Sequence, residues 1–383
     1  MVTRSEAAAL AAGNPLSFLH VCRSDIDLPP DTDPHDPRIY AKARQNLDLF
    51  FQDGSLIREA EPMLYLYELT MDGRAQTGVV GCVHVEDYDR DVIKKHEKTR
   101  KDKEDDRTRH VLTLNAHAEP VFLTHPSTPF ITQLNSKVMA EDPLYDFTSP
   151  DGVRNRVWRI RNTSQYTDGF RRIGVGYVAD GHHRSASASR AAAERRSANP
   201  NHTGNEEYNW FLAVFFPANQ VRILPYFRVV KDLNGQTPEM FLEALARVGT
   251  LTPTDTPAPD RAGSFGIRVG PVWYRLVLDP NSIKENDPVG SLDVTLLHER
   301  ILAPLLGIGD VRTDPRIDFV GGIRGIAELE RRVASGEAGV AFALYPVTVS
   351  QLMAIADAGQ IMPPKSTWFE PKLKSGLFVH SLD

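Results

Sequence analysis

Short apolar stretches bounded by turn residues recur along the chain, and their spacing predicts a mixture of hairpins and helices. Residues 63–69 and 77–85 are rich in aromatic and β-branched side chains and flank the turn 71–74, a pattern typical of a β-hairpin. By the same criteria we expect further strands at 17–21, 120–124, 173–179, 208–216, 221–230, 265–269, 272–278, 317–320, 340–345 and 377–382.

Other segments follow the helical period. We expect helices to start near Ser5 and to span 39–50, 185–197, 238–248, 294–302, 325–333 and 347–358. Because helices and hairpins follow no regular alternation, the order favours an α+β fold over a parallel sheet. The three prolines of 250–262 predict a linker between a core of residues 1–249 and a C-terminal α+β domain of residues 263–383.

Composition narrows the class of protein. The 383 residues are 41% hydrophobic and 25% charged, as in ordinary globular domains, and the net charge of −6 argues against a surface that coats nucleic acid. Two cysteines, Cys22 and Cys82, fit a reducing compartment, and their apolar surroundings predict inert thiols. We find neither an apolar run near the ~20 residues of a membrane span nor a signal peptide, so we expect a soluble cytoplasmic protein.

The strongest pattern for chemistry is Asp180-Gly181-His182-His183-Arg184, between a predicted strand and a predicted helix. Free backbone N–H groups and the helix dipole at such a junction favour a phosphate or a carboxylate. Gly181 allows close approach of a ligand, and the Arg184 guanidinium can bind phosphate oxygens in pairs. The alternative is an Asp N-cap on an ordinary helix with surface histidines.

A second candidate is the charged stretch 94–109, in which Glu97 is flanked by lysines and arginines. Such a carboxylate stays ionised near neutral pH and can accept a proton or a metal ion. His96-Glu97 is not the start of a His-Glu-x-x-His zinc helix, because position 100 is Arg. The alternative is a solvated charged loop.

A third candidate is Lys365-Ser366-Thr367, which follows the rigid pair Pro363-Pro364 and offers one cation and two hydroxyls, with Lys372 behind it. Without a Gly-rich loop it is not a nucleotide-binding motif by itself. We expect this segment to fold back from the second domain onto the 180–184 turn and close the site; the alternative is a surface loop before a final strand.

Longer motifs carry a resemblance. The chain resembles the domain-of-unknown-function 1015 family, which is related to free-serine kinases of the ParB/sulfiredoxin superfamily. The resemblance rests on residues 14–20, 95–100, 106–107, 180–184, 224–226, 228–230, 319–322 and 362–367. It implies a ParB/sulfiredoxin-like mixed-sheet core with insertions, plus a C-terminal α+β region. Members of the family usually carry a further N-terminal stretch, so we expect this chain to lack a strand and part of the site.

The resemblance also implies a function, a small-molecule phosphotransferase that uses ATP or ADP with Mg²⁺ and acts on a metabolite hydroxyl such as that of free serine. The residues implied in catalysis are Glu97, Asp180, His182 and His183. Those implied in phosphate binding are Gly181, His183, Arg184, Arg107, Lys365, Ser366 and Thr367, and those implied in substrate binding are His96, Thr99 and Arg100. A non-catalytic nucleotide-binding switch and a phosphoester hydrolase remain alternatives.

Overall fold

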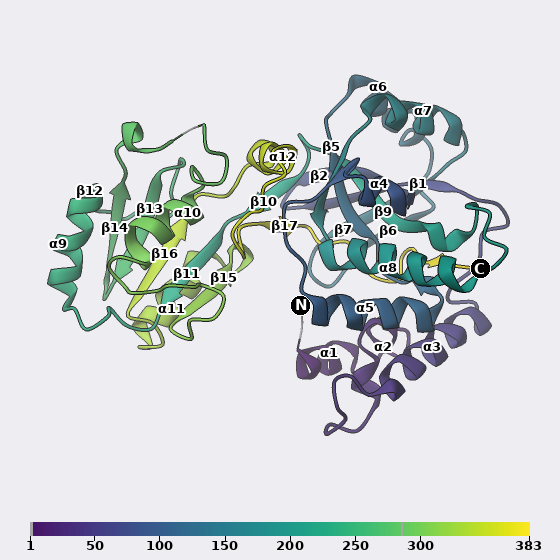
Figure 1. Cartoon of the computed structure of the whole chain (residues 1–383), viewed down its shortest axis with the longest axis horizontal. Coiled ribbons are helices and arrows are strands. Elements are labelled where there is room, and N and C mark those ends of the chain that lie inside the picture. Colours follow the sequence, from purple (N-terminus) through teal and green to yellow (C-terminus); the bar gives the residue numbers. More distant parts are fainter. Residues whose placement is uncertain (1–2, 285) are drawn as a thin grey trace. The chain divides into compact units, whose positions relative to one another are not determined.

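The structure is a computed structural model, and it describes residues 3–284 and 286–383. The chain divides into two units, each with its own sheets. The first unit is Met1–Val221 together with the C-terminal segment Pro371–Asp383, and the second is Arg222–Glu370 (Figure 1). None of the helices in the described ranges has the length and apolar character that crossing a membrane requires.

A mixed eight-stranded sheet forms the centre of the first unit, with strand order β3-β8-β5-β9-β2-β1-β7-β6. The pairs β3–β8 and β5–β9 are parallel and the other pairs are antiparallel. Its strands are β1 Leu64–Met71, β2 Arg74–His84, β3 Ile93–Lys94, β5 Val121–His125, β6 Tyr145–Thr148, β7 Arg154–Ile160, β8 Gly176–Asp180 and β9 Trp210–Pro217.

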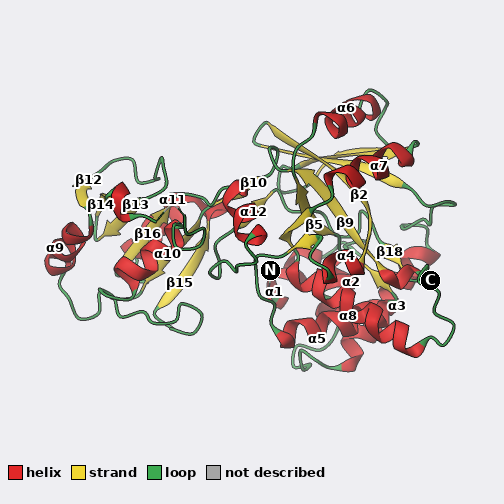
Figure 2. Cartoon of the chain, turned by 45° about the horizontal axis from the view of Figure 1, so that its top comes forward, coloured by secondary structure: helices red, strands yellow, loops and turns green. Residues whose placement is uncertain are grey.

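Two groups of helices cover this sheet, which lies between them in both views (Figures 1 and 2). The helices are α1 Arg4–Ala11, α2 Leu19–Cys22, α3 Pro37–Gln52, α4 Val85–Asp89, α5 Lys101–Leu114, α6 Pro129–Val138, α7 Thr163–Ile173 and α8 His182–Ala198. Helix α8 packs on β5, β8 and β9 through small buried residues such as Ala188 and Ala192, which let it approach the sheet closely. Helices α6 and α7 pack on β1, β2 and β7 around Trp158 and Tyr166.

The C-terminal segment is built into the first unit. Its strand β18 His380–Ser381 pairs with β4 Ala116–His117. The Phe378 ring lies 5.2 Å from the Tyr65 ring and 5.7 Å from the Tyr67 ring, so the segment packs against β1. The chain therefore leaves the first unit after Val221 and returns to it at Pro371.

The second unit holds an antiparallel six-stranded sheet of order β12-β14-β13-β16-β11-β15, beside a separate β10–β17 pair. The strands are β10 Arg222–Leu224, β11 Tyr226–Val230, β12 Thr250–Pro253, β13 Ser264–Val269, β14 Val272–Val277, β15 Ile317–Gly321, β16 Val340–Leu344 and β17 Trp368–Glu370. The helices are α9 Pro238–Val248, α10 Asp293–Leu297, α11 Gly325–Ala334 and α12 Val349–Asp357. Its core includes Phe227, Trp273 and Leu329.

These elements confirm the predicted α+β class, the 63–85 hairpin and the helix 238–248. The strand predicted at 17–21 is wrong, because a turn at Asn14 leads into helix α2 there. An apolar run this short is compatible with a strand and with a helix, so its pattern could not distinguish them. The strand predicted at 377–382 is reduced to His380–Ser381. Helix α6 and strands β6 and β7 were not predicted at all.

The units join at 221/222 and 370/371, whereas the sequence analysis predicts a linker over 250–262. The first four residues of that stretch form β12, which pairs with β14 at the edge of the second sheet. Proline has no backbone N–H to donate, and it is tolerated on an edge strand because one edge of such a strand has no neighbouring strand to bond to. A proline-rich stretch therefore belongs to a folded unit here.

The attachment of the C-terminal segment can be tested at Gly376, which has a φ of +79° and would place a Cβ 2.4 Å from the Phe18 ring. Gly152, in the same unit, has a φ of +81° and open space around it. Both Gly→Ala variants pay about 1 kcal/mol for the left-handed conformation. Gly376→Ala should lose about 1–3 kcal/mol more in urea unfolding because of the overlap with Phe18. Equal losses would contradict this packing.

Candidate functional site

The predicted strand-to-helix turn is present in the first unit. Strand β8 ends at Asp180, Gly181 has a φ of +108°, and helix α8 begins at His182 without a side-chain cap. A Cβ on Gly181 would lie 3.0 Å from Nε of Arg184, so the guanidinium lies directly over the glycine. The turn thus combines an uncapped helix N-terminus with a cation, although its ligand stays a prediction.

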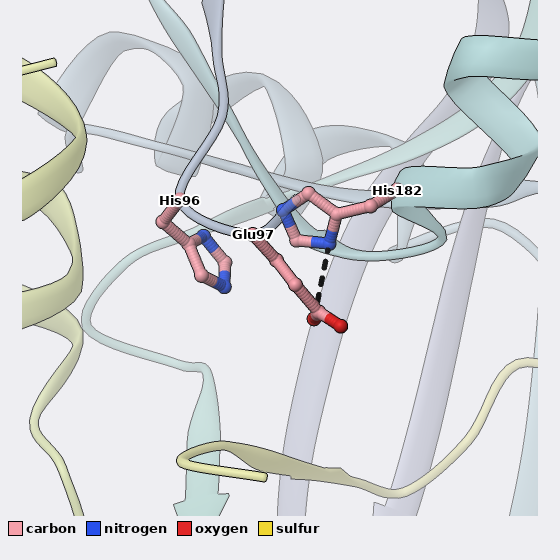
Figure 3. Close-up of side chains that lie close together, drawn as sticks. All are labelled: His96, Glu97 and His182. Atoms are coloured by element: carbon pink, nitrogen blue, oxygen red, sulfur yellow. Dashed lines mark ion pairs between the residues drawn. The ribbon is translucent and has the colours of Figure 1, made fainter. Parts of the chain in front are cut away.

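Three side chains converge beside this turn: His96, Glu97 and His182 (Figure 3). Glu97 Oε2 lies 3.7 Å from Nδ1 of His182. The two imidazole rings meet edge to face, with centroids 4.4 Å apart. His96 is 1% exposed and His182 4%, whereas the Glu97 side chain is 49% exposed. The fold therefore brings together the first and second sequence candidates.

Burial keeps the two histidines neutral. Burial lowers the pKa of His96 to about 4, and the nearby charge of Asp180 offsets only part of that effect. Burial, followed by the neighbouring His96, lowers the pKa of His182 well below its usual value. Each ring therefore carries an available lone pair at neutral pH.

Asp180 forms an ion pair with the C-terminal segment. Its Oδ2 lies 2.8 Å from Nζ of Lys372, and its Oδ1 lies 3.6 Å from Nη2 of Arg184. Burial opposes ionisation of this carboxyl, but the charges of Lys372 and Arg184 outweigh burial and hold its pKa well below the usual range. Asp180 is therefore an ionised carboxylate whose charge is balanced by two cations. Such a group is a weak proton acceptor, which fits poorly with the catalytic role expected for it.

The segment around Glu97 is held against α8. The backbone N–H of Arg100 donates to Nε2 of His183 over 3.1 Å, and the Thr99 hydroxyl donates to Glu104 on α5. Two of the cations expected to flank Glu97 form ion pairs with other carboxylates: Lys95 with Asp91 at 2.8 Å, and Arg100 with Asp102 at 2.8 Å. His182 lies beside the Glu97 carboxylate.

A pocket of the first unit joins the two arginines expected to bind phosphate. Arg107, Arg184 and Glu119 line it, together with His110, His117 and Ser187. Arg107 Nη1 lies 2.8 Å from Oε2 of Glu119. Burial raises the pKa of Glu119, but the charges of Arg107 and Arg184 outweigh burial and lower that pKa below its usual value, so the carboxyl is ionised. Glu119 is a site residue that the sequence did not single out, because it lies in no recognisable local pattern. Lys372 was noted only behind Lys365-Ser366-Thr367, and its pairing with Asp180 was not predicted.

Lys365, Ser366 and Thr367 lie in the second unit. The Ser366 hydroxyl, on a side chain that is 5% exposed, donates to the Pro363 carbonyl over 2.7 Å. The buried Arg228 donates to the Lys365 carbonyl over 2.9 Å. These contacts assign Ser366 to a turn of the second unit, and phosphate binding by this segment stays a prediction.

The Mg²⁺ implied by the sequence resemblance does not fit the donors near the turn. Mg²⁺ prefers oxygen ligands, whereas the His96, Glu97 and His182 cluster supplies two nitrogens and one carboxylate. The other carboxylate of the turn, Asp180, is already paired with Lys372 and Arg184.

Comparisons with known proteins place the chain in a family. Residues 1–295 match the family described as "Protein of unknown function (DUF1015)", and the chain belongs to that family. No curated protein matches it. The family description assigns no activity.

Solved structures resemble the chain weakly. A free serine kinase in complex with AMP is 13% identical, with 76% of this chain and 86% of that chain covered and a TM-score of 0.35. SbnI with a C-terminal truncation, from Staphylococcus aureus, is 13% identical, with 79% and 85% covered and a TM-score of 0.40. A conserved hypothetical protein from Pyrococcus furiosus is 13% identical, with 77% and 93% covered and a TM-score of 0.34. Scores this low carry no assignment of activity, and the superfamily stays a prediction.

The pairing of Asp180 with Lys372 generates a test. A double-mutant cycle with Asp180→Asn and Lys372→Met should give a coupling energy of about 1 kcal/mol at pH 7, measured by urea unfolding. The folded pKa of Asp180 is depressed, so this coupling is fully present above the ordinary Asp pKa of about 4 and is lost as the pH falls further. Additive effects at pH 7 would show that the two side chains do not interact.

Proposed function

We propose that this protein transfers a phosphoryl group from a nucleotide to the hydroxyl of a small metabolite. One observation carries the proposal: the Arg184 guanidinium lies over Gly181 at the uncapped N-terminus of α8, and the Glu97 carboxylate lies beside the same turn. Phosphoryl transfer depends mainly on positioning and on neutralising charge, so an anion-binding turn next to a base meets its basic needs. The sequence motifs make free serine the first acceptor to test.

The phosphate of the nucleotide is proposed to bind at the turn and in the adjoining pocket. Backbone N–H groups of the first turn of α8 face an anion there, as at other helix N-termini. Arg184 and Arg107 line one pocket, and each has more N–H donors than its present partners use. A phosphate would therefore gain charged hydrogen bonds without first removing either arginine from Glu119 or Asp180.

Glu97 is proposed as the general base. Its carboxylate is half exposed, and it can accept the proton of an acceptor hydroxyl. The hydroxyl oxygen forms a bond to the terminal phosphorus while the bond from that phosphorus to the bridging oxygen breaks, and the nucleotide leaves one phosphate shorter. The neutral His182, at 3.7 Å, adds no second charge that would weaken the base.

Two alternatives come from other classes. A phosphoester hydrolase consumes nucleotide without an acceptor, and a nucleotide-binding switch consumes it slowly or not at all. Incubation of the protein with ATP or ADP, with and without free amino acids, followed by phosphorus NMR, separates the three. A new phosphoester signal that appears only with an acceptor supports transfer; consumption without an acceptor supports hydrolysis.

Arg184→Ala should weaken nucleotide binding by about ten- to a hundredfold, because a charged hydrogen-bonded contact contributes roughly 1.5–3 kcal/mol. Isothermal titration calorimetry with ADP and ATP measures the change. Arg190→Ala is the matched control, since Arg190 lies on the same helix and pairs with Glu104 and Asp105. Equal affinity in wild type and Arg184→Ala would remove the turn from the nucleotide site.

Glu97→Gln should reduce turnover by about a hundredfold or more and leave nucleotide affinity almost unchanged, because it preserves shape and removes proton acceptance. Turnover is followed by phosphorus NMR with the acceptor that the screen identifies. Asp102→Asn, at an exposed carboxylate paired with Arg100, serves as the control. If Glu97→Gln keeps near-normal turnover, another group must be the base.

A further inference from the structure

We propose that His96, Glu97 and His182 bind a divalent first-row transition metal ion such as Zn²⁺. The inference goes beyond phosphotransfer, which needs no protein-held ion of this kind. It starts from a feature of the site that the proposed function leaves unexplained, two buried histidines next to a carboxylate.

The three side chains already lie close to a ligating geometry. One ligand atom from each residue can be chosen so that all lie within 4.8 Å of one another, and Glu97 Oε2 is 3.7 Å from Nδ1 of His182. Ligands at the usual zinc distances of about 2.0–2.2 Å lie about 3.3 Å apart. Shifts of about 1 Å would therefore close the site, and the Glu97 side chain is half exposed.

Hydrogen bonding also points to a missing partner. Both ring nitrogens of His96, and Nε2 of His182, are buried and make no well-formed hydrogen bond within the described part of the chain. A buried polar atom without a partner is costly, because it has lost its hydrogen bonds to water. A metal ion would accept a lone pair from each ring and remove part of that cost.

The chemistry of the donors selects the class of ion. Neutral imidazole suits Zn²⁺ and its first-row neighbours, whereas Mg²⁺ and Ca²⁺ require oxygen ligands. The single carboxylate lowers the net charge of the bound ion. Three protein ligands also leave at least one coordination position for water or another ligand.

A bound ion would also regulate the proposed reaction, and this part of the inference rests on the proposed function. An oxygen that donates its electron pair to a metal ion is a poorer proton acceptor. Since Glu97 is both the proposed base and a proposed ligand, the metal-bound form is expected to be the inactive one. Turnover should then fall in step with the occupancy of the site.

The test measures metal binding without nucleotide or acceptor, so its result is independent of the proposed function. Chelator-treated full-length protein is titrated with Zn²⁺ and with Mg²⁺ in a calorimeter, and Co²⁺ is added separately to record its absorption spectrum. We expect one equivalent of Zn²⁺ to bind more tightly than Mg²⁺, and Co²⁺ to show the bands of a site with nitrogen ligands. Absence of stoichiometric Zn²⁺ binding, or tighter binding of Mg²⁺, would overturn the proposal.

Variants locate the ion. Glu97→Gln and His182→Ala should each weaken Zn²⁺ binding by at least about tenfold, since loss of even an outer partner of a ligand costs that much. His35→Ala is the control, because His35 is an exposed histidine of the first unit whose Nδ1 lies 3.8 Å from Oδ1 of Asp106. The fold of each variant is checked by circular dichroism, and the exposed Glu97→Gln keeps the test decisive if His182→Ala unfolds. Equal affinity in all variants would place the ion elsewhere.

The regulatory part is tested with the wild-type enzyme and the identified acceptor. Turnover is measured across the Zn²⁺ concentrations that fill the site in calorimetry. A decrease that follows occupancy, and is reversed by a chelator, supports competition for Glu97. Undiminished turnover at full occupancy would overturn it.

Discussion

Strand β8 passes into helix α8 over a single residue, Gly181, and its φ of +108° is open to glycine but strained for residues with a side chain. This one conformation sets the direction of the next three side chains. His182 points into the unit against His96, His183 accepts from the 96–100 segment, and Arg184 lies back over the glycine. A side chain at position 181 would strain this conformation, and its Cβ would crowd the Arg184 guanidinium, so the arrangement of the site depends on this turn.

The charges around the turn are largely balanced by ion pairs. Asp180 pairs with Lys372, and Arg107 with Glu119, in surroundings where burial opposes each carboxylate. Unpaired charges would be costly there, because water is partly excluded. The remaining polar groups, the two histidines, avoid that cost by staying neutral. The Glu97 carboxylate has more access to solvent than either Asp180 or Glu119.

Local sequence patterns predicted the parts of this site but not their assembly. A strand, a glycine and a helix in succession are visible in residues 176–198, and the 180–184 turn follows from them. The burial of His96 could not be predicted, because its neighbours are charged and the pattern resembles a solvated loop. The parallel pairing of β3 with β8 places that histidine beside the turn. The paired residues lie some eighty positions apart in the sequence, so local periodicity could not predict the pairing. The pairing of Lys372 with Asp180 was not predicted for the same reason, because these two residues lie still further apart in the sequence.

The path of the chain has a consequence for synthesis. The second unit, Arg222–Glu370, is an insertion between two parts of the first, and Lys372 follows it. A ribosome therefore finishes β8, the Gly181 turn and α8 long before it makes the cation that pairs with Asp180. Domains generally fold as units during translation. Until the last dozen residues emerge, the nascent first unit carries Asp180 without that partner, and the fully balanced site forms only after the whole inserted unit has been made.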